Sequence, residues 1–479
     1  MLLWVLATTL ANAATVNVDP TSSIQTLTSA LTPGTEVVFA DGTYTFTGIL
    51  DWTGLGTAEA PIILRADEGA HPVLQTSDGW VVARLRDSSF VQIKGLTFSG
   101  TPDLLAGEST FGGLSVTTVS DVTITDCVFT NIGGTAVGFG GNNTDVTFER
   151  NEISHTDNGS GLVVGCGDAS CWMQDSVIAN NWIHDLGGEY GYGMLFESGT
   201  QNVEVADNVV YNMAFRGIQV ESTEYGDPNQ VHGNVVWAIG SDGDDVGIGI
   251  YGAAVVQNNV IFNITGRGMR IGQDGDRPFE RVAVSFNTIV NTTDWGLDLS
   301  AWGEREGMVL ANNVVANPVT RALRVQNPAD GGIDAANYLS NNIVTGYVEG
   351  LDPLLYPTAF IPGSGFSDFV DVAAWNFYPA VGSALIDSGD ASGAAFVPTD
   401  DFNAMPRDGG NPDVGAYEVW QTDNPGWVIS EGFKTLTDGQ IDPIEVGGCC
   451  NKDKSAPEEG LVLVPVLAYA LRSRRARRT

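Results

Sequence analysis

Short apolar segments recur along this chain, and each begins just after an Asn, Asp or other turn residue. They read, for example, D-N-V-V-Y from Asp207 and N-N-V-I-F from Asn258. The asparagine in front of the apolar residues recurs at steps of 25 to 30 residues, at Asn151, Asn181, Asn208, Asn234, Asn259, Asn287, Asn313 and Asn342. A repeat of this length marks stacked units that cannot bury an apolar face alone. The pattern therefore predicts a solenoid.

Each repeat also contains a second short strand that follows a small residue, as in G-M-L-F-E from Gly193 and G-M-R-I from Gly268. Strands of this length with Gly and Asn between them, and no helical period, indicate β-coils. Coils of about 25 residues suit a right-handed parallel β-helix, in which strands of successive coils pair about 4.8 Å apart. A sandwich or propeller competes, but propeller blades need about 40 residues or more. We predict an all-β, single-stranded right-handed parallel β-helix of about ten or more coils.

The recurrent asparagine suits a ladder, because its amide can bond to its counterpart in the next coil and Asn tolerates a left-handed bend. A stack of coils exposes strand edges and needs caps. Residues 22–31 place Ile24, Leu27 and Leu31 on one helical face, which predicts an N-terminal helical cap. After Tyr347 the repeat gives way to Pro-rich loops, where we expect the stack to end.

The two ends of the chain predict export and anchoring. Residues 1–13 form an apolar run that ends in A-N-A, a cleavage pattern, although the usual basic start is missing. Residues 447–479 contain Cys449, Cys450, an apolar stretch too short to span a bilayer comfortably, and an Arg cluster. This order resembles the C-terminal sorting signals of bacterial surface proteins, particularly those of myxobacteria. The resemblance implies processing near the two cysteines and attachment to the outer membrane or cell envelope; a frayed cationic tail is the alternative.

The charge of the predicted mature chain is strongly negative. Residues 14–446 carry 55 of the 58 acidic residues and 15 of the 22 basic ones, a net charge of −40. Such a surface disfavours nucleic acid and anionic membranes. It also repels polyanionic glycans unless calcium or local arginines reverse the field. For an exported protein, solubility is the simpler interpretation.

Three cysteines lie in the predicted β-helix. Cys166 and Cys171 are close enough for a loop disulfide in an oxidising compartment. Cys127 falls in a predicted strand and is expected to be a buried, inert thiol.

Residues 36–98 carry a family resemblance. They read E-V-V-F-A-D-G-T-Y-T-F from Glu36, G-T-A-E-A-P-I-I-L-R-A from Gly56 and F-V-Q-I-K-G-L-T-F from Phe90. This resembles the opening coils of the chondroitinase B and alginate lyase family, and it implies a right-handed β-helix with calcium-assisted lyase activity. The family's catalytic Lys and Arg do not carry over, because Glu197 and Ser198 stand at the corresponding strand end and no Lys occurs between Lys94 and Lys434.

A second resemblance covers the end of the predicted β-helix. The chain reads A-L-I-D-S-G-D from Ala384, D-D-F-N-A-M-P-R-D from Asp400 and D-V-G-A-Y-E from Asp413. This resembles the closing module of many bacterial surface β-helix proteins and implies an end cap and a surface location. The predicted organisation is a signal peptide over 1–13, a β-helix over 14–383, a closing module over 384–420, a linker over 421–446 and a sorting signal over 447–479.

Alternate residues of the Gly-led strands point outward and stack from coil to coil. One predicted outward row reads Leu195, Gln219, Gly249, Arg270, Asp298, Arg324, and the next reads Glu197, Glu221, Tyr251, Gly272, Ser300, Gln326. Arg270, Asp298 and Arg324 would form a salt-bridge ladder. Glu197 and Glu221 would be like charges in neighbouring coils, relieved by Ca²⁺, by a shared proton or by Arg216. Two carboxyl groups about 5 Å apart also suit a retaining glycosidase.

Four consecutive ladder asparagines, from Asn181 to Asn259, are each followed three positions later by an aromatic residue. These residues form a predicted stripe of His184, Tyr211, Trp237 and Phe262. An exposed stripe would be a platform for stacking sugar rings, to which Tyr251 and Trp295 would add. A stripe buried under a loop would instead be a stabilising aromatic stack.

These features predict a monomeric, exported or cell-surface β-helix protein that binds polysaccharide, with no nucleic-acid partner. If it is an enzyme, a divergent lyase or glycosidase would use Glu197, Glu221, Arg267 and Arg270, with Ca²⁺ as a cofactor on the two glutamates. A non-catalytic surface or adhesion protein is the alternative.

Overall fold

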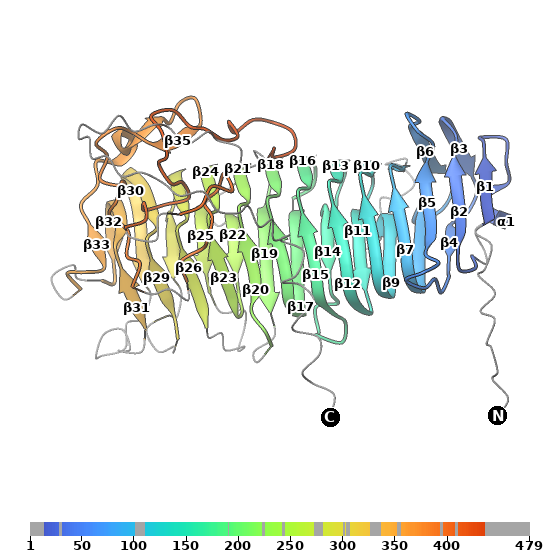
Figure 1. Cartoon of the computed structure of the whole chain (residues 1–479), viewed down its shortest axis with the longest axis horizontal. Helices are drawn as coiled ribbons and strands as arrows, with labels where there is room; N and C mark the ends of the chain where they lie inside the picture. The colour runs from blue at the N-terminus through green and yellow to red at the C-terminus, as the bar shows by residue number, and fades with distance from the viewer. Residues whose placement is uncertain are drawn as a thin grey trace, which may run out of the picture. The chain divides into compact units, whose positions relative to one another are not determined.

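The short apolar segments wind into successive coils in the computed structural model, with β1 at one end of the stack and β33 at the other (Figure 1). The structure describes residues 14–27, 31–100, 111–189, 191–222, 226–241, 245–272, 281–299, 302, 307–325, 337–351, 356–392, 396–407 and 411–435. All of these belong to one compact unit that spans residues 1–440. Every pairing between the strands of the coils is parallel, so the predicted right-handed parallel β-helix is confirmed.

The strands form three faces, and the long strands β7, β9, β17, β30 and β32 each bend from one face onto another. The first face contains β1 (Ala14–Val18), β2 (Thr35–Phe39), β5 (Ile62–Ala66), the ends of β7 (Ala83–Lys94) and β9 (Phe111–Thr125), β12 (Asn142–Glu149), β15 (Trp172–Ala179), the end of β17 (Tyr192–Ala206), β20 (Asn229–His232), β23 (Ala254–Gln257), β26 (Val282–Ser285), β29 (Val309–Ala311) and β31 (Tyr338–Ser340).

The second face contains β3 (Gly42–Phe46), β6 (Pro72–Thr76), β8 (Thr97–Ser99), β10 (Val128–Ile132), β13 (Glu152–Thr156), β16 (Trp182–Leu186), β18 (Val209–Met213), β21 (Val235–Ile239), β24 (Val260–Ile264), β27 (Thr288–Thr292), the start of β30 (Val314–Val325), β32 (Asn342–Glu349) and β33 (Phe360–Ile361). The third face contains β4 (Leu50–Trp52), the starts of β7, β9 and β17, β11 (Thr135–Gly140), β14 (Leu162–Val164), β19 (Arg216–Ser222), β22 (Val246–Ile250), β25 (Arg267–Ile271), β28 (Leu297–Leu299) and the ends of β30 and β32.

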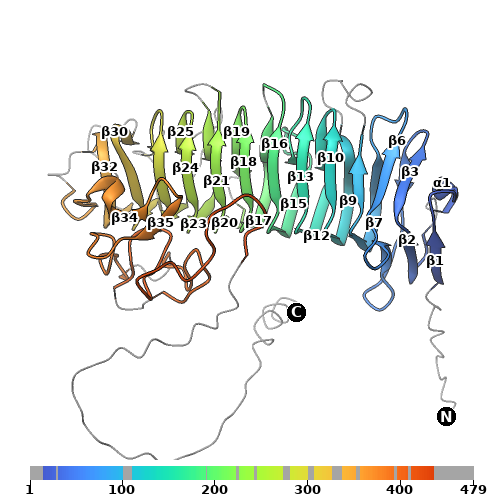
Figure 2. The same cartoon turned by 90° about the horizontal axis from the view of Figure 1, so that it is seen from above.

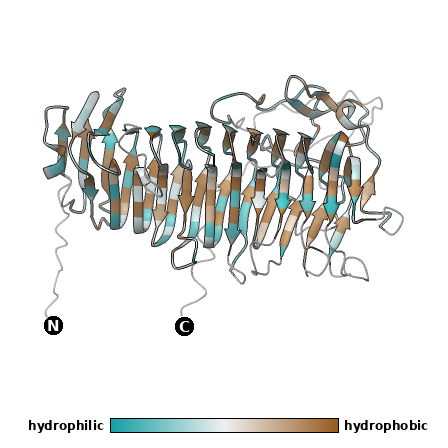
Figure 3. Ribbon diagram, turned by 180° about the vertical axis from the view of Figure 1, so that it is seen from behind, coloured by the Kyte–Doolittle hydropathy of each residue, from teal (hydrophilic) through white to brown (hydrophobic). Residues whose placement is uncertain are grey.

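Hydrophobic residues recur on strand after strand along the solenoid (Figure 3). Their side chains fill the interior, where Phe98 and Phe129 are fully buried and stack with ring centroids 4.9 Å apart. One continuous apolar core therefore links the coils.

The predicted asparagine ladder runs through the interior from Asn151 to Asn342. Each side-chain Nδ2 donates a hydrogen bond to Oδ1 of the next ladder asparagine at 2.9–3.2 Å. The left-handed bend, which we assigned to the same asparagines, instead lies one residue earlier, for example at Asp207 (φ 54°), Asn258 (φ 54°) and Asn312 (φ 57°). The bend turns the chain so that the following asparagine points inward, where its amide has no water to bond.

The N-terminal cap is shorter than the sequence predicts. Helix α1 (Ile24–Leu27) makes a single turn, and Leu31 forms a β-bridge with Gly54 instead of continuing the helix. Ile24 and Leu31 are buried, so the apolar residues still cover the end of the stack.

Residues 365–435, which we call the closing segment, run back along the solenoid (Figure 2). The segment contains the short 3₁₀ helix η2 (Gly365–Asp368) and the antiparallel pair β34 (Phe369–Asp371) and β35 (Asn376–Pro379). Residues 421–435 fall in the predicted linker over 421–446, and in this part Trp427, Ile429 and Lys434 are buried against the solenoid or the rest of the segment.

Candidate functional site

The outward row that we predicted on the third face is in register. Leu195, Gln219, Gly249, Arg270, Asp298 and Arg324 are paired residues of β17, β19, β22, β25, β28 and β30. Their neighbours in each strand point inward and are buried, as Met194, Ile218 and Met269 show. The alternation therefore gives one outward position per coil, about 5 Å from the next. This position is polar at Gln219, Arg270, Asp298 and Arg324.

The glycine at the second position of β17, β19, β22 and β25 has a packing reason. A Cβ at Gly217 would lie 2.5 Å from the carbonyl oxygen of Gly247, and one at Gly247 would lie 2.6 Å from that of Gly268. The backbones of successive coils thus approach too closely here for a side chain. This column of glycines fixes the position of the polar residues that follow it.

Seven arginines lie in strands of the third face: Arg84, Arg86, Arg216, Arg267, Arg270, Arg321 and Arg324. Arg84 and Arg86 both pair with Asp51 at 2.9 Å, and their hydrogen bonds lower the pKa of that carboxyl to about 2. Nearly half of the 15 basic residues between residues 14 and 446 are thus gathered on one face of a chain that is strongly acidic. The local charge of this face differs from that of the whole molecule.

The predicted ladder of Arg270, Asp298 and Arg324 forms only in part. Arg324 binds the buried Asp298 with two hydrogen bonds, of 2.9 and 2.7 Å. The second arginine on Asp298 is Arg267, at 3.1 Å, and not Arg270 as we predicted. Arg267 also lies 3.4 Å from Asp294, which in turn pairs with Arg321 at 3.0 Å. The carboxylates are therefore shared diagonally between coils, which holds Arg267 in an ion cluster.

Arg216 and Arg270 differ from the other arginines of this face. Within the described part of the chain, neither has a carboxylate within 4.0 Å, and the Nε of each is buried without a hydrogen-bond partner. The guanidinium of Arg216 lies over Phe215, 4.6 Å from the ring centroid, and also bonds Gln219. That of Arg270 lies 5.8 Å from the ring centroid of Tyr251. No described carboxylate therefore contacts either guanidinium group directly.

Tyr251 lies in a cradle made by two glycines. A Cβ at Gly249 would lie 2.8 Å from the Tyr251 ring, and one at Gly272 would lie 3.2 Å from it. The ring is 7% exposed, and its hydroxyl has no hydrogen-bond partner among the described residues. The predicted contact of Tyr251 with a sugar ring is therefore not available in this conformation.

Trp295 is also buried, at 1% exposure, so it does not present a face to solvent as predicted. Arg321 and Arg324 lie over its ring, 5.3 and 5.2 Å from the centroid. Trp295 thus supports the ion cluster.

Glu197 is half-buried against the loop closed by the disulfide. It packs on Gly165, where a Cβ would lie 2.7 Å from the Glu197 Cβ. Burial raises the pKa of Glu197, and the charge of Asp168 adds to this, while a backbone hydrogen bond from Gly167 opposes it. A carboxyl group with a raised pKa keeps its proton to a higher pH than an ordinary glutamate, which favours a role as a proton donor.

Glu221 has different neighbours. It accepts a hydrogen bond of 2.5 Å from Nε2 of Gln219, whose Oε1 is bonded by Arg216. Arg216 thus reaches Glu221 through an amide. Calcium prefers six to eight oxygen ligands, and the described residues contain no group of three or more His, Cys, Asp or Glu side chains able to hold a metal. Calcium on Glu197 and Glu221 stays a prediction.

The aromatic stripe is stacked and buried. His184, Tyr211, Trp237 and Phe262 lie in consecutive strands, with successive ring centroids 5.4, 4.2 and 5.6 Å apart and planes within 15°. They are at most 6% exposed. The closing segment covers them, with Trp375 on Trp237 and Phe262 and with Phe433 on the neighbouring Trp182. The exposed sugar platform is therefore wrong, and the buried alternative holds.

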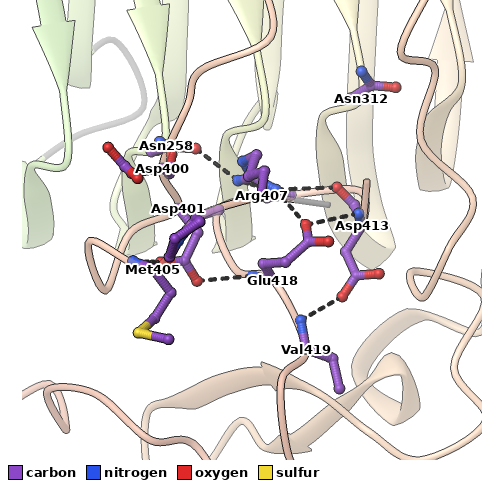
Figure 4. A network of polar contacts seen from close by, with 12 residues as sticks. Asn258, Asn312, Asp400, Asp401, Met405, Arg407, Asp413, Glu418 and Val419 are labelled. Atoms are coloured by element: carbon purple, nitrogen blue, oxygen red, sulfur yellow. Dashed lines mark hydrogen bonds and ion pairs between the residues drawn. The ribbon is translucent and has the colours of Figure 1, made fainter. Parts of the chain in front are cut away.

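A buried polar network holds the closing segment on the solenoid (Figure 4). Arg407 donates to Glu418 at 3.2 Å and to Oδ1 of Asn258 at 2.7 Å, and its guanidinium lies 4.2 Å from the Phe286 ring centroid. Asp401 accepts hydrogen bonds from three backbone amides, including that of Glu418. The sequence motif around Asp400 predicted an end cap. It did not predict that Arg407 would bond Asn258, in a coil more than 100 residues earlier.

The cysteines of the described part are in two states. Cys166 and Cys171 form a disulfide, and Cys127 is a free, buried thiol whose pKa is raised by burial to about 12. The predicted signal peptide over 1–13, the outward positions Ser300 and Gln326, and the anchor residues Cys449 and Cys450 lie outside the described residues. No helix among the described residues is long and apolar enough to cross a membrane.

Comparisons with known proteins support the fold. Residues 77–236 match the family model described as the right handed beta helix region. No curated protein matches the chain. The crystal structure of pectate lyase Pel9A aligns with a TM-score of 0.53 at 15% identity, covering 85% of this chain and 97% of that one.

Two further solved structures have lower scores. A mannuronic acid specific polysaccharide family 6 lyase from human gut microbiota aligns with a TM-score of 0.44 at 17% identity, covering 73% of this chain and 90% of that one. The Streptococcus pneumoniae surface protein and adhesin PfbA aligns with a TM-score of 0.39 at 11% identity, covering 66% and 88%. At these identities the likeness is one of fold.

Proposed function

We propose that this protein binds an acidic polysaccharide along the third face of its β-helix. The observation that carries the proposal is the pair of arginines, Arg216 and Arg270, that no described carboxylate contacts directly. In a segment with a net charge of −40, an arginine has many acidic residues to pair with. Two partly buried arginines without such a partner therefore favour an external anion.

The spacing of the two arginines suits a linear glycan. Arg216 lies in β19 and Arg270 in β25, with β22 between them, so they are two coils or about 10 Å apart along the solenoid. One coil thus advances about as far as one sugar unit of an extended chain. A glycan that lies along the solenoid axis would meet both guanidinium groups with carboxylate or sulfate groups, which Arg binds bidentately.

The test is binding of the mature protein to a panel of acidic and neutral polysaccharides. We expect retention on acidic glycans, and Arg216→Met or Arg270→Met should weaken it at least tenfold. Arg281→Met is the matched control, because Arg281 also has no described carboxylate partner but lies just before β26 of the first face. Equal losses in all three variants, or no retention of acidic glycans, would overturn the proposal.

Cleavage is a second candidate function, favoured by the raised pKa of Glu197. In hydrolysis, Glu197 would give its proton to the leaving glycosidic oxygen as the C1–O bond breaks, and a water molecule would add its hydroxyl group to C1 and return a proton to Glu197. New reducing ends without an unsaturated product would indicate hydrolysis, and added absorbance from an unsaturated sugar would indicate lyase action. Glu197→Gln should abolish either signal and leave binding in place.

Running the assay with calcium and with a chelator tests the calcium prediction. Retention without products leaves a binding or adhesion protein.

We also propose that the protein acts outside the cytoplasm. The disulfide between Cys166 and Cys171 supports this, because such bonds persist in oxidising compartments. Recovery of the protein at the cell surface, with residues 1–13 removed, is the expected result of fractionation and N-terminal sequencing.

A further inference from the structure

A polar pocket lies where the closing segment crosses the first face. Its floor is formed by Gln230, His232 and Gln257 of β20 and β23, of which His232 and Gln257 are paired in register. Its wall is formed by Asp400 and Phe402 of the closing segment, and Asp207 lies at one end. The cavity measures about 340 Å³. We call it the junction pocket.

The side chains of the junction pocket are held in place but keep bonding capacity. Nε2 of Gln257 donates to Oγ of Ser285 and to the carbonyl of Phe396, which fixes the amide and leaves Oε1 without a partner among the described residues. His232 uses Nε2 on Glu204, at 3.0 Å, and no described residue bonds its Nδ1. Asp400 turns away from the Arg407 network (Figure 4) and accepts a bond from Thr399 through Oδ2 alone.

Lys434 lies behind the lining of the junction pocket, and its ammonium group is already occupied by residues that line the pocket. Nζ of Lys434 is fully buried, donates to Asp207 at 2.6 Å and to the carbonyl of Gly233 at 2.9 Å, and lies 3.7 Å from the Phe402 ring centroid. Asp400 and Glu204 then leave the described surroundings of the pocket negative. A carboxylate or sulfate would be repelled here, so the pocket does not take the ligand proposed for the third face.

We propose that the junction pocket binds one or two units of a neutral saccharide. Hydroxyl groups both donate and accept. They can donate to Oε1 of Gln257, Nδ1 of His232 and Oδ1 of Asp400, and they can accept from the second N–H of Gln230, whose first N–H bonds the carbonyl of Pro228. An ammonium ligand would only donate, and it would leave the second N–H of Gln230 unmatched. The cavity lies at the lower end of the range of ligand sites, about 300–1,000 Å³, which excludes a long oligosaccharide. The protein would thus contact glycan at two places of opposite charge.

The experiment is a calorimetric titration of the full chain with glucose, galactose, mannose, lactose and cellobiose. We expect at least one to bind, and Asp400→Ala or Gln230→Ala to weaken that binding at least tenfold. Both substitutions remove partly or fully exposed side chains, so the fold should persist, which the unfolding midpoint checks. Asp423→Ala, an exposed carboxylate of the same segment outside the pocket, and Arg270→Met on the third face should leave it unchanged.

The outcomes separate this site from the arginine face. Loss of neutral-sugar binding in Asp400→Ala with unchanged retention of acidic polysaccharide supports a separate pocket. The proposal is overturned if none of the five sugars binds, if both pocket variants bind as the parent does, or if spermidine or glucuronate binds in their place.

Discussion

At the scale of single residues, the ladder asparagine is the feature that connects the coils. A buried amide can donate and accept at once, so one residue type serves the coil on either side. Asn234 accepts from the backbone and side chain of Asn208 and donates to Asn259 and to the carbonyl of Val205. A substitution here leaves several buried polar groups without partners.

We therefore expect Asn234→Ala to destabilise the protein by about 3 kcal/mol, because each buried polar group left unpaired costs about 1–3 kcal/mol. Asn142→Ala, an exposed asparagine of β12, is the control and should change stability by less than about 0.5 kcal/mol. Denaturant unfolding measures both. Equal losses of stability in the two variants would mean that the ladder asparagine contributes no more to stability than the exposed Asn142.

His184 gives the aromatic stack a pH dependence. Burial alone would lower its pKa, but the carboxylates of Glu152, at 3.5 Å, and Asp185, at 2.8 Å, raise it above the ordinary 6.5. The folded state thus binds the proton more tightly, so the stabilisation is present below pH 6.5 and is lost as the pH rises through the higher folded-state pKa.

Stability should accordingly be greater at about pH 6 than at about pH 8.5. His184→Phe keeps a ring between Trp182 and Tyr211, which stack on the histidine at 4.2 and 5.4 Å. The variant should lose this part of the pH dependence. Unfolding midpoints at the two pH values measure it, and an unchanged difference in the variant would assign the effect to other groups.

At the scale of elements, the closing segment is held by contacts with turns of the solenoid. Asn341 bonds Ser388, Asn312 bonds Asp390 and Asn258 bonds Asp400, so the segment follows the residues that make the left-handed bends. Lys434 is the last of these contacts that the structure describes.

Lys434→Met should therefore free the end of the closing segment without unfolding the coils. Removing one partner of a buried ion pair costs about 3–5 kcal/mol, and the partial exposure of Asp207, at 19%, reduces the loss to about 2–3 kcal/mol by the same reasoning. Limited proteolysis should cut the variant between residues 421 and 435. Lys94→Met is the control, since Lys94 is 62% exposed and 3.7 Å from Asp126. Equal protection of parent and Lys434→Met would show that the lysine does not hold the segment.

At the scale of the whole molecule, the acidic surface and the arginine face act over different distances. The screening length falls from about 30 Å at 0.01 M salt to about 10 Å at 0.1 M and 3 Å at 1 M. Low salt therefore exposes an acidic glycan to the repulsion of the whole molecule, whereas contacts of about 4 Å with Arg216 and Arg270 are screened only at high salt.

Affinity for the acidic polysaccharide should thus pass through a maximum near about 0.1 M salt. In Arg270→Met, the affinity should fall less steeply at high salt, and its rise at low salt should be unchanged. A titration series in sodium chloride measures this, and a steady decline from the lowest salt would contradict the idea that the net charge opposes binding.

The sequence by itself determined the fold and the register of the third face. Asparagines spaced 25–30 residues apart must stack when each amide bonds the next, and this stacking brings Gln219, Arg270 and Asp298 into one row. Local pattern suffices here because a solenoid pairs each coil mainly with its neighbours.

Only the tertiary structure decided whether the aromatic stripe faces solvent and which charged side chains form ion pairs. The cover on Trp237 and Phe262 comes from Trp375, more than 100 residues later, and no repeat announces it. Asp298 pairs with Arg267, because a long flexible side chain reaches a carboxylate outside its own row. Burial and ion pairing depend on distances between side chains, which the spacing of residues along the chain does not fix.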